Sequence, residues 1–411
     1  MNIESITAQD GSAIVTVNGT PQKLAAGNLD DARAQVVTLA RQHAAESGEN
    51  VTLTASDPDG TWTVTVTPSG DLEESTGPTK THTEDTASPA PTVQHTNPQL
   101  PIRCEGRGRH SFLKTTEVEQ PATKGLRGLA TRLGLRMAPS KEERAERADI
   151  HAVSQHWPGP RTIVIANGKG GAGKTPAAVL LSAVFARYGG AGVVAWDANQ
   201  TRGTLGWRTE QGPHDATVLD LLPQAEHLLG TGAQSADLAH YVHHQTADRY
   251  DVLRSQPIKL AADQRVTPTD VDLIWNVVGK YYRLIFIDTG NDESDPVWLQ
   301  VIEHADQVVV PTTTRADHAE AGALLLDALR TRDEHSRQLA ETAVAIVTQA
   351  DPRASSTDIK AIVTGYQDLA REVVTIPHDP AIVDGILQWD SLRPDTQRAW
   401  LRAAAAVAHG L

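Results

Sequence analysis

The sequence predicts an α/β protein whose mostly parallel sheet is covered by helices on both faces, preceded by a small α+β domain and a flexible linker. Three observations predict this arrangement. From Arg161 onward, apolar runs that do not alternate with polar residues are separated by Ala- and Leu-rich helical patterns, which is typical of strands buried on both faces. Near the N-terminus, two hairpin patterns flank one helical pattern. Between these regions lies a segment rich in Thr, Ser, Pro and Glu.

The composition excludes several classes of protein. Of the 411 residues, 39% are hydrophobic, which is enough to build a core. Cys104 is the only cysteine, so a disulfide framework and metal sites built from several cysteines are excluded. No run of about 18 apolar residues and no export-signal pattern occurs, and we expect a cytoplasmic protein. The net charge of −14 argues against a chain coated for DNA, although a local basic patch could still bind it.

Residues 1–70 are predicted to form a small ββαββ domain. Asp-Gly dipeptides at Asp10 and Asp59 mark the two hairpin turns, because this dipeptide readily adopts positive φ. The expected strands and helix are Ile3–Gln9, Ala13–Val17, Leu29–Ala45, Val51–Ala55 and Trp62–Thr67. The domain carries no catalytic constellation, so we expect it to bind an unidentified protein partner.

Two connecting segments follow. Residues 71–120 bury too little apolar area to offset chain entropy and are predicted to be a flexible linker. Residues 121–158 begin with a short basic amphipathic helix and continue as a connector. This helix either packs its leucines on the following domain or contacts anionic lipid or nucleic acid. We favour packing, because Gly128 and Gly134 weaken an isolated helix.

Residues 159–411 are predicted to be the α/β domain. Right-handed helical crossovers should connect its parallel strands. The expected strands are Thr162–Ala166, Gly192–Trp196, Tyr250–Leu253, Leu284–Ile287, Gln307–Pro311, Ala343–Thr348 and Val373–Ile376.

A glycine-rich loop between the first of these strands and a helix fits the phosphate-loop pattern G-x-x-x-x-G-K-[ST]. Glycines let backbone N–H groups surround phosphate oxygens, and the helix N-terminus adds its positive end. Lys174 should reach the β- and γ-phosphates, and the Thr175 hydroxyl should bind Mg²⁺. Asp288 ends an apolar strand, and we expect its carboxylate to order the Mg²⁺ shell through water. The expected nucleotide-binding residues of the loop are Gly168, Lys169, Gly170, Gly171, Ala172, Gly173, Lys174, Thr175 and Pro176.

Lys169 completes the string K-G-G-x-G-K-T, and with it the sequence resembles the deviant phosphate loop of the ParA/MinD ATPases. The resemblance continues through residues 159–411. It implies a P-loop NTPase fold, ATP as the nucleotide, and a homodimer that forms when ATP binds. It also implies that Lys169 reaches the ATP of the partner copy.

The same resemblance assigns roles to three further segments. Asp197 follows the second strand, where the family has its first switch segment, and Asp288–Gly290 resembles the second switch. Pro377, His378 and Asp379 resemble the loop that flanks the purine ring.

Two departures from the family pattern affect the expected chemistry. Asn199 stands where members with fast hydrolysis have a second acid after Asp197, so we expect slow ATP turnover. Pro176 replaces a Thr and removes one N–H and one hydroxyl from the α-phosphate side. The residues expected to carry hydrolysis are Lys169, Lys174, Asp197, Asn199 and Asp288.

Within the family, residues 201–206 and 377–385 are most similar to the actinobacterial MinD-like proteins associated with type VII secretion (EspI-type). The resemblance implies an ATP-dependent dimerisation switch that positions or regulates a cargo, either in plasmid or chromosome partition or in type VII secretion. The alternative is a nearly inactive nucleotide-binding scaffold or interaction protein. DNA and an anionic membrane both stay open as the surface that the protein uses.

Overall fold

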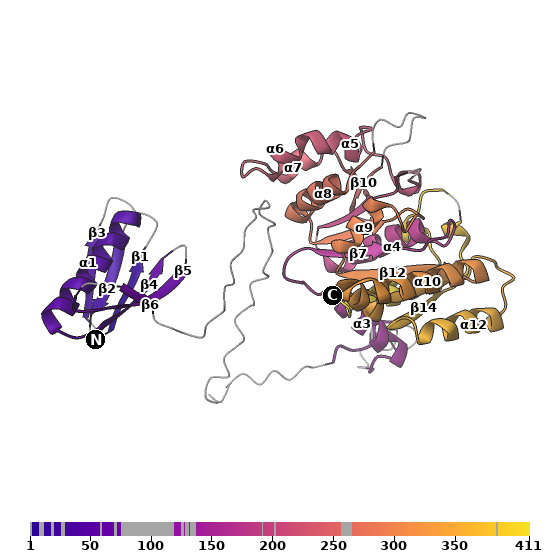
Figure 1. The fold of residues 1–411 in the computed structure, drawn as a ribbon. Coiled ribbons are helices and arrows are strands. Elements are labelled where there is room, and N and C mark those ends of the chain that lie inside the picture. Colours follow the sequence, from indigo (N-terminus) through magenta and orange to yellow (C-terminus); the bar gives the residue numbers. More distant parts are fainter. Residues whose placement is uncertain are drawn as a thin grey trace. The chain divides into compact units, whose positions relative to one another are not determined.

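The computed structural model describes two compact units, Met1–Gln94 and His95–Leu411 (Figure 1). The described residues are 2–7, 12–17, 20–25, 29–57, 60–69, 72–74, 119–124, 127, 131, 137–190, 192–200, 203–255, 265–383 and 385–411. Most of the predicted linker, most of the predicted basic helix, and residues 201–202 lie outside these ranges.

The first unit is a six-stranded sheet with one helix against it (Figure 1). Its elements are β1 (Asn2–Thr7), β2 (Ser12–Val17), β3 (Thr20–Ala25), α1 (Leu29–Ser47), β4 (Val51–Asp57), β5 (Gly60–Val66) and β6 (Leu72–Glu74). Two antiparallel three-stranded meanders are joined by parallel pairing of β1 with β4, which gives the order β3-β2-β1-β4-β5-β6. Val36 and Ala40 of α1 are buried in the same core as Val15 and Leu53 of the sheet.

The predicted ββαββ pattern is present in this unit, with one further strand at each edge. Strand β3 escapes prediction because its residues Thr20–Lys23 are polar or proline and all are exposed, as suits the edge of a sheet. The three-residue β6 pairs with β5 and lies within the segment that composition predicts to be linker. A three-residue strand is too short to show an alternating pattern of polar and apolar residues.

The second unit contains an eight-stranded sheet of order β14-β13-β12-β7-β11-β8-β10-β9. Its strands are β7 (Arg161–Ile165), β8 (Val193–Asp197), β9 (His243–His244), β10 (Asp251–Leu253), β11 (Leu284–Asp288), β12 (Gln307–Thr313), β13 (Val344–Thr348) and β14 (Glu372–Ile376). All pairs are parallel except β9 with β10. All seven predicted strands are present, and the antiparallel edge strand β9 is added to them.

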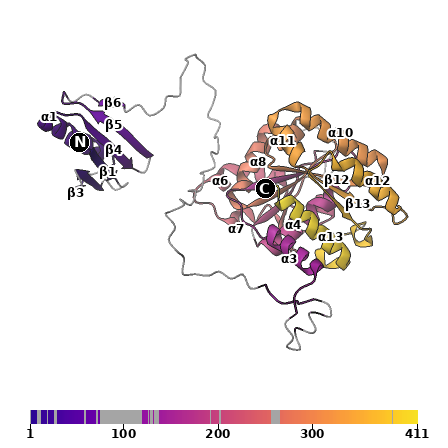
Figure 2. The same cartoon turned by 90° about the horizontal axis from the view of Figure 1, so that it is seen from below.

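Helices cover both faces of this sheet (Figure 2). One face carries α3 (Lys141–Val153), α4 (Lys174–Gly189) and α13 (Pro394–Ala408). The other face carries α5 (Val218–Leu221), α6 (Ala225–Leu229), α7 (Ser235–Leu238), α8 (Pro268–Tyr281), α9 (Pro296–Glu303), α10 (Ala316–Arg332), α11 (Glu334–Thr342) and α12 (Ser356–Gln367).

The sequence of the central strand β7 is mostly apolar because the strand is buried on both faces of the sheet. Ile163 and Ile165 are buried in the core beneath α4, whereas Val164 is buried in the core on the opposite face. A strand with two buried faces has no polar side, which is the property that predicts a covered parallel sheet. The predicted fold class is therefore confirmed.

Helix α3 belongs to the second unit. Ser140 caps it by accepting a hydrogen bond from the backbone N–H of Glu143 at 3.1 Å. Val153 is fully buried in the core that contains α4 and α13, and Asp149 pairs with Arg398 of α13 at 2.6 Å. In the parts of the chain that the structure describes, no helix is both long and apolar enough to cross a membrane.

Candidate functional site

The phosphate loop lies at the carboxyl end of β7, in the middle of the eight-stranded sheet, and leads directly into α4. Gly171 and Gly173 have φ angles of 82° and 96°, in the left-handed region that favours glycine. Gly173 is the N-cap of α4. The loop therefore joins the end of a strand to the positive end of a helix, which is the arrangement that binds phosphate.

Asn167, which the sequence analysis did not single out, holds the loop in place. Its side-chain amide donates to the carbonyl oxygens of Pro311 at 2.9 Å and His318 at 3.1 Å. Its side-chain oxygen accepts from the backbone N–H of Lys169 at 2.9 Å. Because Asn167 is buried, these bonds tie the loop to β12 and α10.

Lys174 lies inside the loop and is only 8% exposed. Its ammonium group donates to three oxygens, Asn167 O at 2.7 Å, Lys169 O at 3.1 Å and Asn291 Oδ1 at 2.5 Å. Burial lowers the pKa of Lys174, and nearby carboxylates oppose this effect. Since an ammonium has three N–H donors, a phosphate oxygen must replace one of these acceptors.

Thr175 and Asp288 meet at the start of α4 and the end of β11. The Thr175 hydroxyl donates to Asp288 Oδ2 at 2.7 Å and lies 2.8 Å from the hydroxyl of Thr204. Asp288 Oδ1 is buried without a hydrogen-bond partner. Burial, together with the neighbouring Asp197 carboxylate, raises the pKa of Asp288 to about 7.

These residues fit a Mg²⁺ ion bound together with a nucleotide. A hydroxyl and a carboxylate supply the hard oxygen ligands that Mg²⁺ prefers, and phosphate oxygens and water complete its shell. The partnerless oxygen of Asp288 offers an acceptor for such an ion or its water. Across the described ranges, no cluster of three or more His, Cys, Asp or Glu side chains could hold a metal by itself.

Asp197 pairs in register with Asp288. Its carboxylate, however, is hydrogen-bonded to the backbone of the turn that follows β8. It accepts from the backbone N–H of Asn199 at 3.1 Å and of Leu205 at 3.3 Å. A Cβ on Gly203 would lie 2.0 Å from both Asp197 Oδ2 and Ser255 Oγ, so the chain passes very close to the carboxylate here. Burial raises the pKa of Asp197 to about 6.

A cavity of about 650 Å³ opens beside the phosphate loop. It gathers much of the predicted site, namely Gly170, Gly171, Gly173, Lys174, Thr175, Pro176, Asn199, Asp288, His378 and Asp379. Of the other predicted residues, Gly168, Lys169, Ala172, Asp197 and Pro377 do not line it. Lys169 is exposed and Ala172 is buried.

The loop predicted to flank the purine ring reaches the cavity. The carboxylate of Asp379 in this loop is hydrogen-bonded to the protein backbone. Asp379 accepts from the backbone N–H of Arg393 at 2.8 Å and of Ala381 at 3.1 Å. Burial acts to raise the pKa of Asp379, yet these backbone bonds hold it below its usual value. His378 lines the cavity beside Asp379.

Sequence reasoning missed several residues at the cavity. Thr204, Trp207 and Asn291 line it, and Glu293 lies against the first turn of the phosphate loop. Trp207 is 65% exposed. None of these residues lies within the phosphate-loop pattern, so only their closeness to the two switch-like segments could have indicated them.

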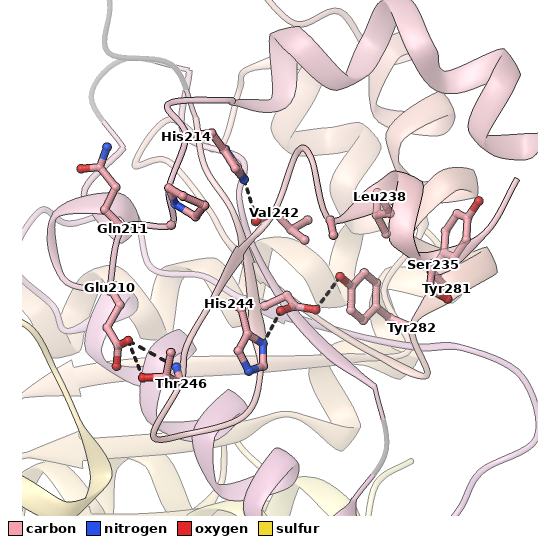
Figure 3. A pocket seen from close by; sticks show the side chains of 14 residues that line it. Glu210, Gln211, His214, Ser235, Leu238, Val242, His244, Thr246, Tyr281 and Tyr282 are labelled. Carbon is pink, nitrogen blue, oxygen red and sulfur yellow. Dashed lines mark hydrogen bonds and ion pairs between the residues drawn. The ribbon is translucent and has the colours of Figure 1, made fainter.

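A second cavity, of about 550 Å³, lies near the sheet edge formed by β9 (Figure 3). The Asp251 carboxylate is bound there by His244 Nδ1 at 2.7 Å and by the Tyr282 hydroxyl at 2.8 Å. His214 Nε2 lies 3.2 Å from the Val242 carbonyl oxygen. The polar groups of this cavity are thus largely paired with one another.

Comparisons with known proteins find matches to part of this chain. Residues 160–340 match the family model described as an AAA domain. The chain is 28% identical over 286 residues to the ESX-1 secretion-associated protein EspI from two strains of Mycobacterium tuberculosis, which covers 67% of this chain. It spans about 40% of the length of these curated relatives.

Solved structures of similar fold include a ParA family ATPase from Chlorobium tepidum, with 19% identity, a TM-score of 0.49, and coverage of 60% of this chain and 98% of that one. The cell division ATPase MinD from Pyrococcus furiosus has 18% identity and a TM-score of 0.45, with the same two coverages. MinD from Pyrococcus horikoshii, solved with Mg-ADP, has 19% identity and a TM-score of 0.45, covering 60% of this chain and 94% of that one.

The phosphate loop, the parallel sheet and the match of residues 160–340 to the AAA-domain model make the second unit similar to P-loop ATPase domains of the ParA/MinD type. Among curated proteins, the chain is similar to the secretion-associated EspI.

Proposed function

We propose that this protein binds MgATP and hydrolyses it slowly, and that ATP binding brings two copies together into a dimer that regulates a secretion or partition machinery. The observations that support ATP binding best are the placement of the Lys174 ammonium inside the loop and the hydrogen bond from Thr175 to Asp288. These residues meet at the carboxyl edge of a parallel sheet beside a cavity large enough for a nucleotide.

In this proposal, the loop residues bind the phosphates. Backbone N–H groups of the loop and the start of α4 face the phosphate oxygens. Lys174 exchanges its bond to Asn291 for a bond to a phosphate oxygen. Thr175 and Asp288 would hold Mg²⁺, which would offset the negative charge of the phosphates. His378 would lie beside the base.

Slow hydrolysis is supported by the segment after β8. Asn199 lines the cavity, whereas the Asp197 carboxylate is bonded to its own turn. An amide can orient a water molecule but cannot accept its proton, so a contribution that a carboxylate could make is missing. Phosphoryl transfer would then depend on positioning and charge stabilisation alone.

The dimer is supported by the position of Lys169. Its side chain is exposed and does not line the cavity of its own chain, although its backbone belongs to the loop. A cation in this place is free to reach a nucleotide held by a second copy. The similarity to EspI supports type VII secretion as the setting, and the N-terminal unit would bind the protein partner.

A nearly inactive scaffold is the second candidate, and the same Asn199 favours it. Such a protein would bind ATP and dimerise without releasing phosphate. DNA and anionic membrane stay open as surfaces, because most of the basic helix lies outside the described residues.

The test is the size of the full-length protein in solution without nucleotide, with ADP and with ATP, each with Mg²⁺. We expect a monomer that becomes a dimer in ATP alone, and we expect Lys169→Ala and Lys174→Ala to abolish the change. Lys360→Ala, at an exposed position on α12, is the matched control. Absence of MgATP binding by the wild-type protein would contradict the proposal.

A further inference from the structure

Two side chains from the segment after β11 lie directly on the first turn of the phosphate loop. Asn291 donates no bond to the loop but accepts one from Lys174, at 2.5 Å. Its amide nitrogen would lie 3.6 Å from a Cβ built on Gly170. Glu293 Oε1 would lie only 2.6 Å from a Cβ built on Gly168. Together these side chains cover the loop from Gly168 to Gly170.

The Glu293 carboxylate is an unusual neighbour for a phosphate-binding loop. Its Oε1 is buried without a hydrogen-bond partner. Burial raises the pKa of Glu293, and the ammonium of Lys174 and the backbone N–H of Gly168 oppose that shift. The groups that attract this carboxylate are therefore a loop N–H and the loop lysine, which are the groups that bind phosphate.

An anion in this position competes with a phosphate. The three donors of Lys174 are already bonded to oxygens, and the one side-chain acceptor among them is Asn291. Any phosphate that reaches Lys174 must displace Asn291, the β-phosphate of ADP included. The γ-phosphate of ATP must also move the Glu293 carboxylate away, because two anions would otherwise share one small cationic site.

We propose that the Glu293 carboxylate acts as a latch on the γ-phosphate side of the loop, and that it sets the relative affinity of the site for ATP and ADP. This inference rests on the proposed function. Both nucleotides displace Asn291 from Lys174, but a diphosphate does not reach the γ-phosphate side, so Glu293 stays in place over ADP. ATP must open the latch, and opening moves the segment that leads into α9.

The apparent affinity for ATP equals the intrinsic affinity multiplied by the fraction of molecules in which the latch is open. If about one molecule in ten is open, removing the Glu293 charge raises ATP affinity about tenfold. ADP affinity changes much less, because ADP does not require opening. The ratio of the two affinities is therefore the signature of the latch.

The experiment is titration of the full-length wild-type, Glu293→Gln and Asp292→Asn proteins with ATP and with ADP, each with Mg²⁺, by calorimetry. Asp292 is the matched control because it is the adjacent acid, it is exposed, and its contacts are to Ser294. We expect Glu293→Gln to raise ATP affinity about tenfold and ADP affinity less than about threefold. We expect Asp292→Asn to change neither.

Asn291→Ala is the second variant, and we expect it to change the affinities for ATP and ADP alike, because both nucleotides displace Asn291 from Lys174. Unchanged or weaker ATP binding by Glu293→Gln would overturn the latch, as would an equal gain for both nucleotides or the same gain in Asp292→Asn. If ATP bound normally but hydrolysis fell at least tenfold, Glu293 would be a catalytic residue and not a latch. Failure of every variant and the wild type to bind ATP would instead overturn the proposed function.

Discussion

Thr175 and Asp288 are hydrogen-bonded at 2.7 Å, and the bond joins the first turn of α4 to the end of β11. It satisfies one oxygen of a buried carboxylate and leaves the other without a partner. Asp197 lies next to Asp288 in register on β8. The centre of the sheet therefore ends in two adjacent buried acids that a cation would stabilise.

The first prediction concerns pH and stability. The pKa values of Asp288 and Asp197 are raised from 3.8 to about 7 and about 6, mainly by burial. A raised pKa means that the folded protein binds these protons more tightly than the unfolded chain. The contribution of this pair to the free energy of unfolding is fully present below pH 3.8. It is lost as pH rises through 6 to 7. We expect the melting temperature without nucleotide to fall between pH 5.5 and 8.

Calorimetric melting of the wild type and Asp288→Asn at both pH values checks this expectation. The variant should show a smaller fall, because its amide does not ionise. Addition of MgATP should raise the wild-type melting temperature more at pH 8 than at pH 5.5, since a bound cation favours the ionised acids. A melting temperature that rises from pH 5.5 to 8 without nucleotide would refute the pKa assignment.

The second prediction concerns the rate of ATP hydrolysis. Asn199→Asp places a carboxylate on the cavity wall, where the wild type has an amide. We expect single-turnover hydrolysis to accelerate at least about tenfold, because a positioned acid or base contributes about 10²–10⁴ in rate. Asn199→Ala should show no acceleration. Equal rates in the Asp variant and the wild type would mean that this position does not limit hydrolysis.

The third prediction concerns the turn that follows β8. Gly203→Ala would place a Cβ 2.0 Å from both the Asp197 carboxylate and the Ser255 hydroxyl. We expect a loss of unfolding free energy of about 1–3 kcal/mol, the usual cost of overpacking a buried position. Gly232→Ala is the control, because its Cβ would meet no atom within 4 Å. Its unfolding free energy should stay within about 0.5 kcal/mol of wild type, and equal denaturation curves for both variants would contradict the close contact.

Local patterns predicted much of the fold. Most of the seven apolar runs became strands buried on both faces, as Ile163 and Val164 illustrate on β7. The edge strand β14 is only partly buried. The strands that escaped prediction are short or lie at an edge, such as β9 with its two residues. Nothing in such a sequence distinguishes a strand from a loop, because pairing with a neighbour decides it.

The site was less predictable wherever it depends on contacts between distant parts of the chain. The loop from Gly168 to Thr175 is continuous in sequence, so one motif contains it. The contact between Lys174 and Asn291 joins residues 117 positions apart, and it depends on how the segment after β11 turns back. The carboxylate of Asp197 turns toward its own backbone because Gly203 allows the chain to approach it. No spacing rule contains that information.

The packing of α3 against α13 has a practical consequence for fragments of this protein. A fragment that begins at residue 159 would lack the helix that buries Val153 and pairs Asp149 with Arg398. Uncovering the alanine-rich side of α13 would give neighbouring molecules an apolar surface on which to aggregate. Expression of the second unit alone should therefore begin no later than Ser140, so that the capped helix is kept whole.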